Sequence, residues 1–316
     1  MTRVAAVDCG TNSIRLLIAD VADGRLTDVV REMTVVRLGQ GVDKTGEFAA
    51  EALERTFAAA DRYATQCTEH EVETIRFVAT SATRDARNRD VFINGIVDRL
   101  GVAPEVVSGE EEARLSFRGA TSVLDAGHDA PYLVVDLGGG STELVLGTSA
   151  PDAAYSMDVG CVRMTERHLA SDPPTGDEIG AAVADVNAAL DIAGDTVDFA
   201  ATRTLVGLAG SITTVTAQAL DLPRYDRDRI NGAVLPIDAA MEACDELLHA
   251  SRNSRAAMGF MHPGRVDVIG AGALVWHTVM GRVREAVRTA GRELPHVVTS
   301  EHDILDGIAF SAADRA

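Results

Sequence analysis

Cysteine is scarce in this sequence and too widely spread for a disulfide framework or a zinc site. Four cysteines occur, at positions 9, 67, 161 and 244, and no two of them form a CxxC motif. The eight histidines are equally dispersed and lack the HExxH spacing of a zinc protease. Such usage is typical of reduced thiols, so we expect a cytoplasmic protein.

Long apolar runs and an excess of positive charge are also missing. No run approaches the ~18–20 apolar residues that cross a bilayer. The first residues lead directly into a strand-like run without the apolar core of a signal peptide, so we expect no membrane partner. Lys and Arg number 29 against 48 Asp and Glu, which gives a net charge of −19. A nucleic-acid partner is not expected, because neutralising many phosphates needs a basic surface.

The length and the element pattern predict an α/β protein with two domains. The chain has 316 residues, 46% hydrophobic and 24% charged, an ordinary globular mixture. Strand-like and helix-like segments alternate, which is typical of α/β folds. The strands expected at 3–8, 14–20 and 26–36 follow so closely that we predict antiparallel neighbours. Further helices are expected at 49–67, 91–100, 110–124, 176–193, 212–220, 237–250 and 266–279, and further strands at 75–79, 105–107, 132–136, 144–146, 204–207 and 296–299.

A polar stretch with glycine and proline, residues 125–131, is the candidate domain boundary. We therefore predict domains at 1–125 and 126–316. The final segment, about 303–316, is expected to form a helix that packs back on the first domain.

A short repeat begins each half of the chain. Residues 8–16 (DCGTNSIRL) align with residues 136–144 (DLGGGSTEL) at a constant offset of 128, with Asp, Gly, Ser and Leu matched. In both copies an apolar strand runs into Asp-x-Gly, crosses a tight turn and leaves as another strand. Two similar halves that face each other would bring both turns to the cleft between them.

The two glycine turns are candidate phosphate-binding loops. Glycine lets backbone amides approach an anion without obstruction by a Cβ atom, and neighbouring hydroxyl groups add donors. A plain β-hairpin is the alternative for one turn, but two copies favour phosphate. Neither turn has the spacing of a Walker loop or of a dinucleotide fold. The candidate residues are Gly10, Thr11, Asn12 and Ser13 in the first turn and Gly138, Gly139, Gly140, Ser141 and Thr142 in the second.

Asp8 and Asp136 lie at strand ends beside these turns. A carboxylate next to bound phosphate is repulsive unless a cation intervenes, and Mg²⁺ or Mn²⁺ binds through few carboxylates plus substrate oxygens. We expect such a metal here. The alternative is that each carboxylate caps amides of its own turn.

Three further segments leave two interpretations open. Arg84 could bind phosphate or form a surface salt bridge. The acidic run Glu110–Glu112 favours a helix N-terminus in any case, and one of its members could be a general base, although the spacing does not decide which. Gly210 and Ser211 follow a predicted strand, where they could hold a phosphate at a helix N-terminus or simply make a tight connection.

Together these segments resemble the exopolyphosphatase / guanosine pentaphosphate phosphohydrolase (Ppx/GppA) family. The resemblance rests on residues 8–13 (DCGTNS), 80–88 (TSATRDARN), 108–114 (SGEEEAR) and 136–143 (DLGGGSTE), which occur in this order. It implies two actin-like (ribonuclease H-like) domains that flank an interdomain cleft, and a homodimer. It also implies hydrolysis of a terminal phosphoanhydride bond.

The resemblance also assigns roles to residues. The catalytic glutamate of the family falls on Glu112, and Asp136 and Glu143 fall on positions that handle metal and water. Arg84 falls on a phosphate-contacting arginine. The first phosphate loop falls on Thr11, Asn12, Ser13 and Arg15, and the second on Gly138, Gly139, Ser141 and Thr142.

We therefore expect a metal-dependent exopolyphosphatase that releases orthophosphate from the end of inorganic polyphosphate. Short chains are favoured as substrates, because this sequence resembles the short, two-domain form of the family. One alternative is a guanosine pentaphosphate (pppGpp) 5′-phosphohydrolase. Another is a catalytically weak sensor that binds (p)ppGpp or polyphosphate, and a sugar kinase is a more distant one.

Overall fold

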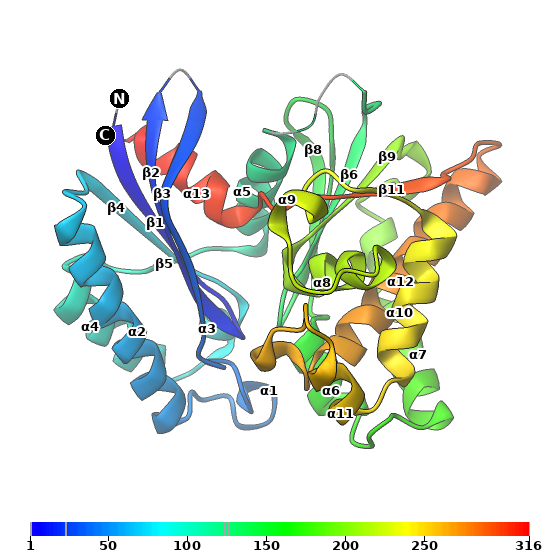
Figure 1. Ribbon diagram of the computed structural model, residues 1–316, viewed down its shortest axis with the longest axis horizontal. Coiled ribbons are helices and arrows are strands. Elements are labelled where there is room, and N and C mark those ends of the chain that lie inside the picture. Colours follow the sequence, from blue (N-terminus) through cyan, green and yellow to red (C-terminus); the bar gives the residue numbers. More distant parts are fainter. Residues whose placement is uncertain (1, 23, 123, 125–126, 316) are drawn as a thin grey trace. The chain divides into compact units, whose positions relative to one another are not determined.

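The computed structural model describes residues 2–22, 24–122, 124 and 127–315. The chain forms two compact units (Figure 1). Unit 1 takes in Met1–Gly119 and Ile304–Ala316, and unit 2 takes in Ala120–Asp303. Residues 125 and 126, on either side of the predicted domain boundary, lie outside the described residues, so that boundary stays a prediction.

Unit 1 is built on a five-stranded sheet in the order β3-β2-β1-β4-β5. The first three strands are antiparallel neighbours as predicted, and β4 and β5 continue the sheet in parallel with β1. The strands are β1 (Thr2–Cys9), β2 (Ser13–Ala22), β3 (Arg25–Val35), β4 (Thr74–Ala79) and β5 (Glu105–Val106).

Alternating side chains of this sheet are buried on both of its faces. Ala5 and Val7 of β1 pack with α2 (Ala50–Glu69) and α4 (Arg89–Leu100). Their neighbours Val4 and Ala6 pack on the opposite face with α5 (Gly109–Thr121) and α13 (Ile304–Ala313). A strand buried on both faces reads as a continuous apolar run, which is why β1 is recognisable in the sequence. Two short helices, α1 (Val42–Thr45) and α3 (Ser81–Asp85), complete the unit.

Unit 2 is built on a six-stranded sheet in the order β10-β11-β9-β6-β7-β8. One face packs on helices α6, α7, α8, α10 and α12, and Trp276 lies in this core. The strands are β6 (Tyr132–Leu137), β7 (Thr142–Gly147), β8 (Pro151–Met157), β9 (Thr204–Leu208), β10 (Val234–Pro236) and β11 (His296–Thr299). The helices are α6 (Cys161–His168), α7 (Gly176–Gly194), α8 (Ala209–Ala219), α9 (Arg227–Ile230), α10 (Ile237–His249), α11 (Arg252–Ala257) and α12 (Ile269–Thr289), with 3₁₀ turns at Phe199–Ala201 and Pro263–Arg265.

The sequence repeat is a repeat of topology. Strands β1 to β5 of unit 1 correspond in order and direction to β6, β7, β8, β9 and β11 of unit 2. The register agrees as well, since Asp8 lies opposite Arg15 and Asp136 lies opposite Glu143, at the same offset of 128. The α/β class with two actin-like halves is therefore confirmed.

Two predicted absences can be compared with the structure. In the ranges that the structure describes, no helix combines the length and the apolarity needed to cross a membrane. All four cysteines are free and buried, so there is no disulfide framework. Burial raises the pKa of each of these thiols, which keeps them in the protonated form.

Candidate active site

The first glycine turn connects β1 to β2 at the carboxyl end of β1. The Gly10 amide donates to the Ser13 carbonyl at 3.0 Å, which closes the turn. The loop after β3 packs against it, since the Gly39 amide donates to the Thr11 carbonyl at 2.8 Å. A side chain at Gly39 would collide with the Thr11 side chain. The predicted turn residues are thus brought together. Thr11 is buried, and the Asn12 carbonyl accepts hydrogen bonds from the start of the loop after β3.

Asp8 and Arg15 are bound to each other beside this turn. Nε and Nη2 of Arg15 donate to Oδ2 of Asp8 at 2.8 and 2.6 Å. Asp8 is buried, and the Arg15 side chain is 20% exposed. Asp8 was expected to bind a metal and Arg15 to bind phosphate. In this structure the carboxylate is bound by the guanidinium instead of standing apart from it.

Arg84 and Glu112 form a second ion pair in unit 1. Nη1 of Arg84 donates to Oε2 of Glu112 at 2.7 Å and to the Val107 carbonyl at 3.0 Å. Arg84 belongs to α3, which follows β4, and Glu112 lies in the first turn of α5, which follows β5. Because β1, β4 and β5 are parallel, their carboxyl ends meet at one edge of the sheet. That edge therefore carries the first turn, Arg84 and Glu112 together.

Burial distinguishes the three acids that the sequence left equivalent. Glu110 pairs with Arg114 and its side chain is 66% exposed. Glu111 contacts Arg76 and is 35% exposed. Glu112 is only 10% exposed. A general base needs a desolvated, fixed position, and Glu112 has that position among the three.

The second glycine turn has the same backbone as the first. The Gly138 amide donates to the Ser141 carbonyl at 3.0 Å. The start of α6 packs closely against this turn, because the amides of Val162 and Arg163 both donate to the Gly139 carbonyl. A Cβ atom at Gly160 would lie 2.5 Å from that carbonyl, so only glycine permits the approach. The sequence prediction missed both α6 and its contact with the turn.

The Thr142 hydroxyl and the Arg163 guanidinium are both hydrogen-bonded to backbone carbonyls around this turn. Oγ1 of Thr142 donates to the Val159 carbonyl at 2.6 Å, and Ser141 is buried. Nε of Arg163 donates to the Gly140 carbonyl at 2.7 Å. The Thr142 hydroxyl therefore stabilises the turn, and the phosphate-binding role of this residue stays a prediction.

Asp136 and Glu143 are cross-strand neighbours beside the second turn. Directly opposite residues of an antiparallel pair share one face of the sheet. Both are buried, with exposed fractions of 7% and 1%, and Oγ of Ser156 donates to Oε1 of Glu143 at 2.8 Å. These hard oxygen donors suit Mg²⁺ or Mn²⁺, which bind through one or two carboxylates plus waters and phosphate oxygens. Among the described residues no group of three or more His, Cys, Asp or Glu side chains is placed to hold a metal ion.

The third predicted segment lies at the same edge of the unit 2 sheet. Helix α8 begins directly after β9, which is parallel to β6. The Arg265 guanidinium lies against Gly210, where any side chain would collide with it. Ser211 is buried at the helix start, and Ala209 before it has a left-handed φ of 68°. Arg265 was not among the predicted site residues. The sequence left its segment, His262–Arg265, ambiguous, and residues 265–269 (RVDVI) are a further stretch that resembles the Ppx/GppA family.

A cluster of hydrogen-bonded polar side chains connects α8 to Tyr225 and Glu301. The Tyr225 hydroxyl is hydrogen-bonded to Oγ1 of Thr213 at 2.7 Å and to Oε1 of Glu301 at 2.5 Å. Burial raises the pKa of Glu301, although Tyr225 and nearby arginines oppose the shift. Burial and the charge of Arg265 lower the pKa of His262, so this imidazole is kept neutral next to the guanidinium.

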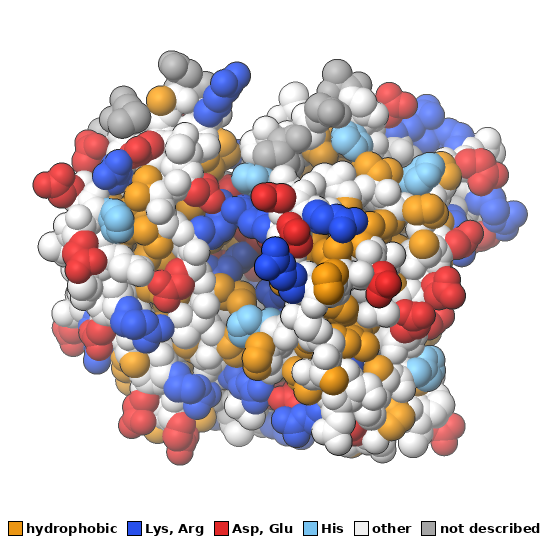
Figure 2. Space-filling view, in the orientation of Figure 1, with side chains coloured by type: hydrophobic (Ala, Val, Ile, Leu, Met, Phe, Trp, Pro, Cys, Tyr) orange, Lys and Arg blue, Asp and Glu red, His pale blue; other side chains and the backbone are white. Residues whose placement is uncertain are grey.

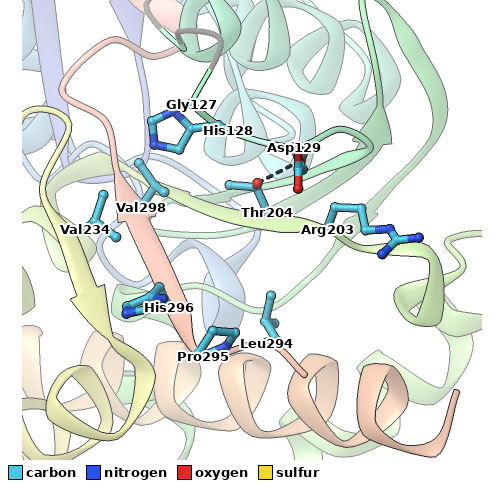
Figure 3. A pocket seen from close by; sticks show the side chains of 10 residues that line it. All are labelled: Gly127, His128, Asp129, Arg203, Thr204, Val234, Leu294, Pro295, His296 and Val298. Atoms are coloured by element: carbon cyan, nitrogen blue, oxygen red, sulfur yellow. Dashed lines mark hydrogen bonds between the residues drawn. The ribbon is translucent and has the colours of Figure 1, made fainter. Parts of the chain in front are cut away.

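A cavity of about 200 Å³ lies at the other edge of the unit 2 sheet (Figure 3). Thr204 and His296, which begin β9 and β11, line it together with His128 and Arg203. Oγ1 of Thr204 donates to the Asp129 carbonyl at 2.7 Å. Because the second turn is at the carboxyl end of β6, this cavity does not belong to the candidate active site.

Comparisons with known proteins show which family the chain belongs to. A family model described as the Ppx/GppA phosphatase family matches residues 17–294. This chain belongs to that family. The resemblance predicted from the four motifs is thereby confirmed.

Two curated or solved relatives match along nearly their full length. Exopolyphosphatase 2 of Mycobacterium tuberculosis is 52% identical, with 99% of each chain covered. The crystal structure of an exopolyphosphatase-like protein is 49% identical, with 99% of each chain covered and a TM-score of 0.96. A more distant structure, the Ppx/GppA family member of Aquifex aeolicus, is 27% identical with a TM-score of 0.80 and covers 99% of this chain and 98% of its own.

Proposed function

We propose that this chain is an exopolyphosphatase, a phosphoanhydride hydrolase that releases orthophosphate from the end of inorganic polyphosphate. One observation carries the proposal: Glu112 is the buried acid of its run, and Arg84 binds it at the edge where the first glycine turn lies. The 52% identity to an exopolyphosphatase along the whole chain supports the same activity. Short chains are the proposed preference.

The proposed chemistry is in-line attack of water on the terminal phosphorus. The water oxygen bonds to phosphorus while the bond to the bridging oxygen breaks, so orthophosphate leaves the shortened chain. Glu112 orients the water and accepts its proton on a carboxylate oxygen. Arg84 holds Glu112 in place through a 2.7 Å hydrogen bond, and its guanidinium can also neutralise a phosphate oxygen.

The phosphate-binding roles are proposed for both units. In unit 1 they fall on Gly10, Thr11, Asn12, Ser13 and Arg15, with Arg84. In unit 2 they fall on the second turn, Gly138–Thr142, and on Gly210 and Ser211 at the start of α8, with Arg265 alongside. Backbone amides serve this purpose because they carry no charge that must be desolvated and need no rearrangement.

The metal is proposed to be Mg²⁺ or Mn²⁺, held by Asp136 and Glu143. Such a cation supplies neutralisation of charge on the phosphate oxygens. Within the chain, Ser156 fixes Glu143 through its 2.8 Å hydrogen bond, and the sheet register fixes Asp136 opposite it. We further propose a cytoplasmic homodimer, on the strength of the family resemblance.

Phosphate release by the purified protein tests the proposal. In the presence of Mg²⁺, the rates with short polyphosphate, long polyphosphate and pppGpp are compared. The Glu112→Gln variant is the negative control for each substrate. Release from polyphosphate that disappears in Glu112→Gln is the expected result, with the rate ratio of short to long chains reporting the preference. Release from pppGpp alone would contradict the proposal and identify the protein as a pppGpp 5′-phosphohydrolase. No release from any of the three, with binding retained, would support a sensor and contradict the proposal.

A further inference from the structure

Arg76 carries a buried charge that the proposed chemistry does not use. It lies in β4, and its side chain is only 3% exposed. Nε and Nη2 donate to Oε2 of Glu105 at 3.2 and 2.8 Å, and Nη2 also donates to Oε1 of Glu111 at 3.3 Å. Nη1 donates to Oγ of Ser311. This guanidinium therefore connects β4 to β5, to α5 and to α13.

One of these contacts lies next to the proposed general base. Glu111 and Glu112 are consecutive residues in the first turn of α5, so they project about 100° apart around the helix axis. Arg76 binds Glu111, and Arg84 binds Glu112 at 2.7 Å. Two guanidinium groups thus hold the first turn of α5 at two points. Together they fix the rotation of the helix about its axis, which decides where the Glu112 carboxylate lies.

Stability alone does not account for an arginine at this position. Burial of a guanidinium costs free energy that its ion pairs repay only in part, and an apolar side chain of similar volume is often as stable. Both carboxylate partners of Arg76 are more than a third exposed, so water can solvate them without it. The Ser311 hydroxyl also donates to the Ile308 carbonyl at 2.7 Å. An apolar residue in place of Arg76 would therefore leave no carboxylate buried without solvation.

We propose that Arg76 is a positioning residue of the reaction. By binding β5, α5 and α13 at once, its guanidinium fixes the rotation of α5 and with it the position of the Glu112 carboxylate. This inference rests on the proposed role of Glu112 and adds the residue that holds it in place. A milder change at one partner, Glu111→Gln, keeps an oxygen that Arg76 can bind and leaves the other two contacts intact.

The variant Arg76→Met separates positioning from stability, because Met is unbranched like Arg and carries no charge. Phosphate release from short polyphosphate is measured with Mg²⁺ present, well below the melting temperature. A displacement of about 1 Å can lower a rate by about 10²-fold, so kcat is expected to fall by about 10–10²-fold, with KM within about twofold of the wild type. The melting temperature, followed by circular dichroism, should stay within about 3 °C of the wild type. Full kcat in the folded variant would overturn the inference.

Arg31→Met is the matched control. Arg31 binds α13 from β3, which is the outer strand at the opposite edge of the sheet from β5. Its partner Asp306 is fully buried, so loss of this guanidinium should lower the melting temperature by more than about 3 °C. Its kcat should nevertheless stay within about threefold of the wild type, because Glu112 keeps its position. Losses of kcat that follow the losses of stability in both variants would identify Arg76 as a structural residue and overturn the inference.

Amide hydrogen exchange gives a readout that does not depend on activity. Faster exchange confined to α5 is expected in Arg76→Met and not in Arg31→Met. Unchanged exchange of α5 in Arg76→Met would overturn the inference whatever the activity. A wild type that releases no phosphate would instead remove the proposed function, while the exchange of α5 would still show whether Arg76 holds the helix.

Arg76→Lys decides if Arg76→Met does not fold. Lysine keeps the charge, but its single ammonium group lacks the planar fork that reaches three partners at once. We expect a folded protein with kcat lowered by about tenfold and with faster exchange in α5. Full kcat and unchanged exchange in this variant would show that charge alone suffices at position 76 and would overturn the positioning role.

Discussion

Glu111 and Glu112 are adjacent in sequence and opposite in environment, which allows a matched pair of variants. Glu112→Gln keeps the size of the side chain but cannot accept a proton, so kcat is expected to fall by about 10²–10⁴. Glu111→Gln changes a partly exposed side chain that contacts Arg76, and its kcat should stay within about threefold of the wild type. Phosphate release at saturating substrate measures both. Equal losses in the two variants would show that Glu112 acts only through the helix it belongs to.

Residue contacts of this kind divide into those the sequence predicts and those it does not. The Asp8–Arg15 pair could have been predicted from the sequence, because a tight turn closed by Gly10 and Ser13 fixes the strand register and places the two opposite charges across from each other. The Arg84–Glu112 pair was not, since its members are 28 residues apart on separate helices and meet only when β4 and β5 pair. Propensity and spacing contain no information about such a contact.

At the scale of elements, α13 supports the helix that carries Glu112. Gly307 of α13 lies directly against the Leu115 carbonyl of α5, so that any side chain there would collide with it. Gly307→Ala is expected to push the helices apart, to lower the free energy of unfolding by about 1–3 kcal/mol, and to lower kcat through displacement of Glu112. Urea unfolding and phosphate release, measured well below the melting temperature, check the two effects.

Gly281→Ala is the matched control for that variant. Gly281 lies inside α12, where a Cβ would meet only the end of Met241 at 3.9 Å. This substitution should leave kcat unchanged and stabilise the helix by up to about 1 kcal/mol. A Gly307→Ala enzyme with full kcat would show that α13 contributes stability alone.

The end of α13 is also held by ion pairs that acid should release. Hydrogen bonding to Arg118 lowers the pKa of Asp314, and burial, which alone would raise the pKa of Glu105, is outweighed by hydrogen bonds from Arg76 and Arg315 that lower it. Carboxyls with depressed folded-state pKa values stabilise the fold above their ordinary values of 3.8 and 4.5, and that stability is lost as pH falls below them. Because both side chains are more than a third exposed, we expect at most about 1 kcal/mol from each pair.

Urea unfolding between pH 6 and pH 3 measures this loss. The double variant Arg118→Gln/Arg315→Gln keeps the Arg76–Glu105 contact but lacks the other two pairs, so it should lose less stability than the wild type as pH falls below 4.5. An identical pH dependence in the two proteins would exclude these pairs as a source of acid sensitivity.

Elements were predictable where their pattern was strong, and they were missed where they lie at the margin of the fold. Strands β1, β2, β4 and β6 are apolar runs bounded by turns, and all were found. Strand β8 is an edge strand that begins with Pro151 and consists mostly of small and polar residues, so it lacks the apolar signal of a central strand. Helix α6 is only eight residues long, and its position follows from close contact between Gly160 and the second turn.

The net charge of the whole molecule has the same sign as that of a polyanionic substrate. Its net charge is −19, and Lys44 is the single lysine, so arginine supplies nearly all its positive charge. On the face shown in Figure 2, acidic and basic side chains are interspersed over both units. Arginine suits phosphate because its planar fork matches two oxygens and its charge does not titrate. Binding by this chain therefore has to combine close arginine and amide contacts with repulsion from the protein as a whole.

These two contributions respond differently to salt. At 10 mM ionic strength the Debye length is about 30 Å and the net charge of the protein reaches an approaching substrate, whereas at 150 mM it is about 8 Å and mostly local groups act. We therefore expect kcat/KM for polyphosphate to rise between 10 and 150 mM NaCl at constant free Mg²⁺. A basic polyanion-binding protein shows the opposite trend, because salt competes with its phosphate contacts. A steady fall of kcat/KM across this range would mean that local arginines outweigh the net charge of −19 even at long distance.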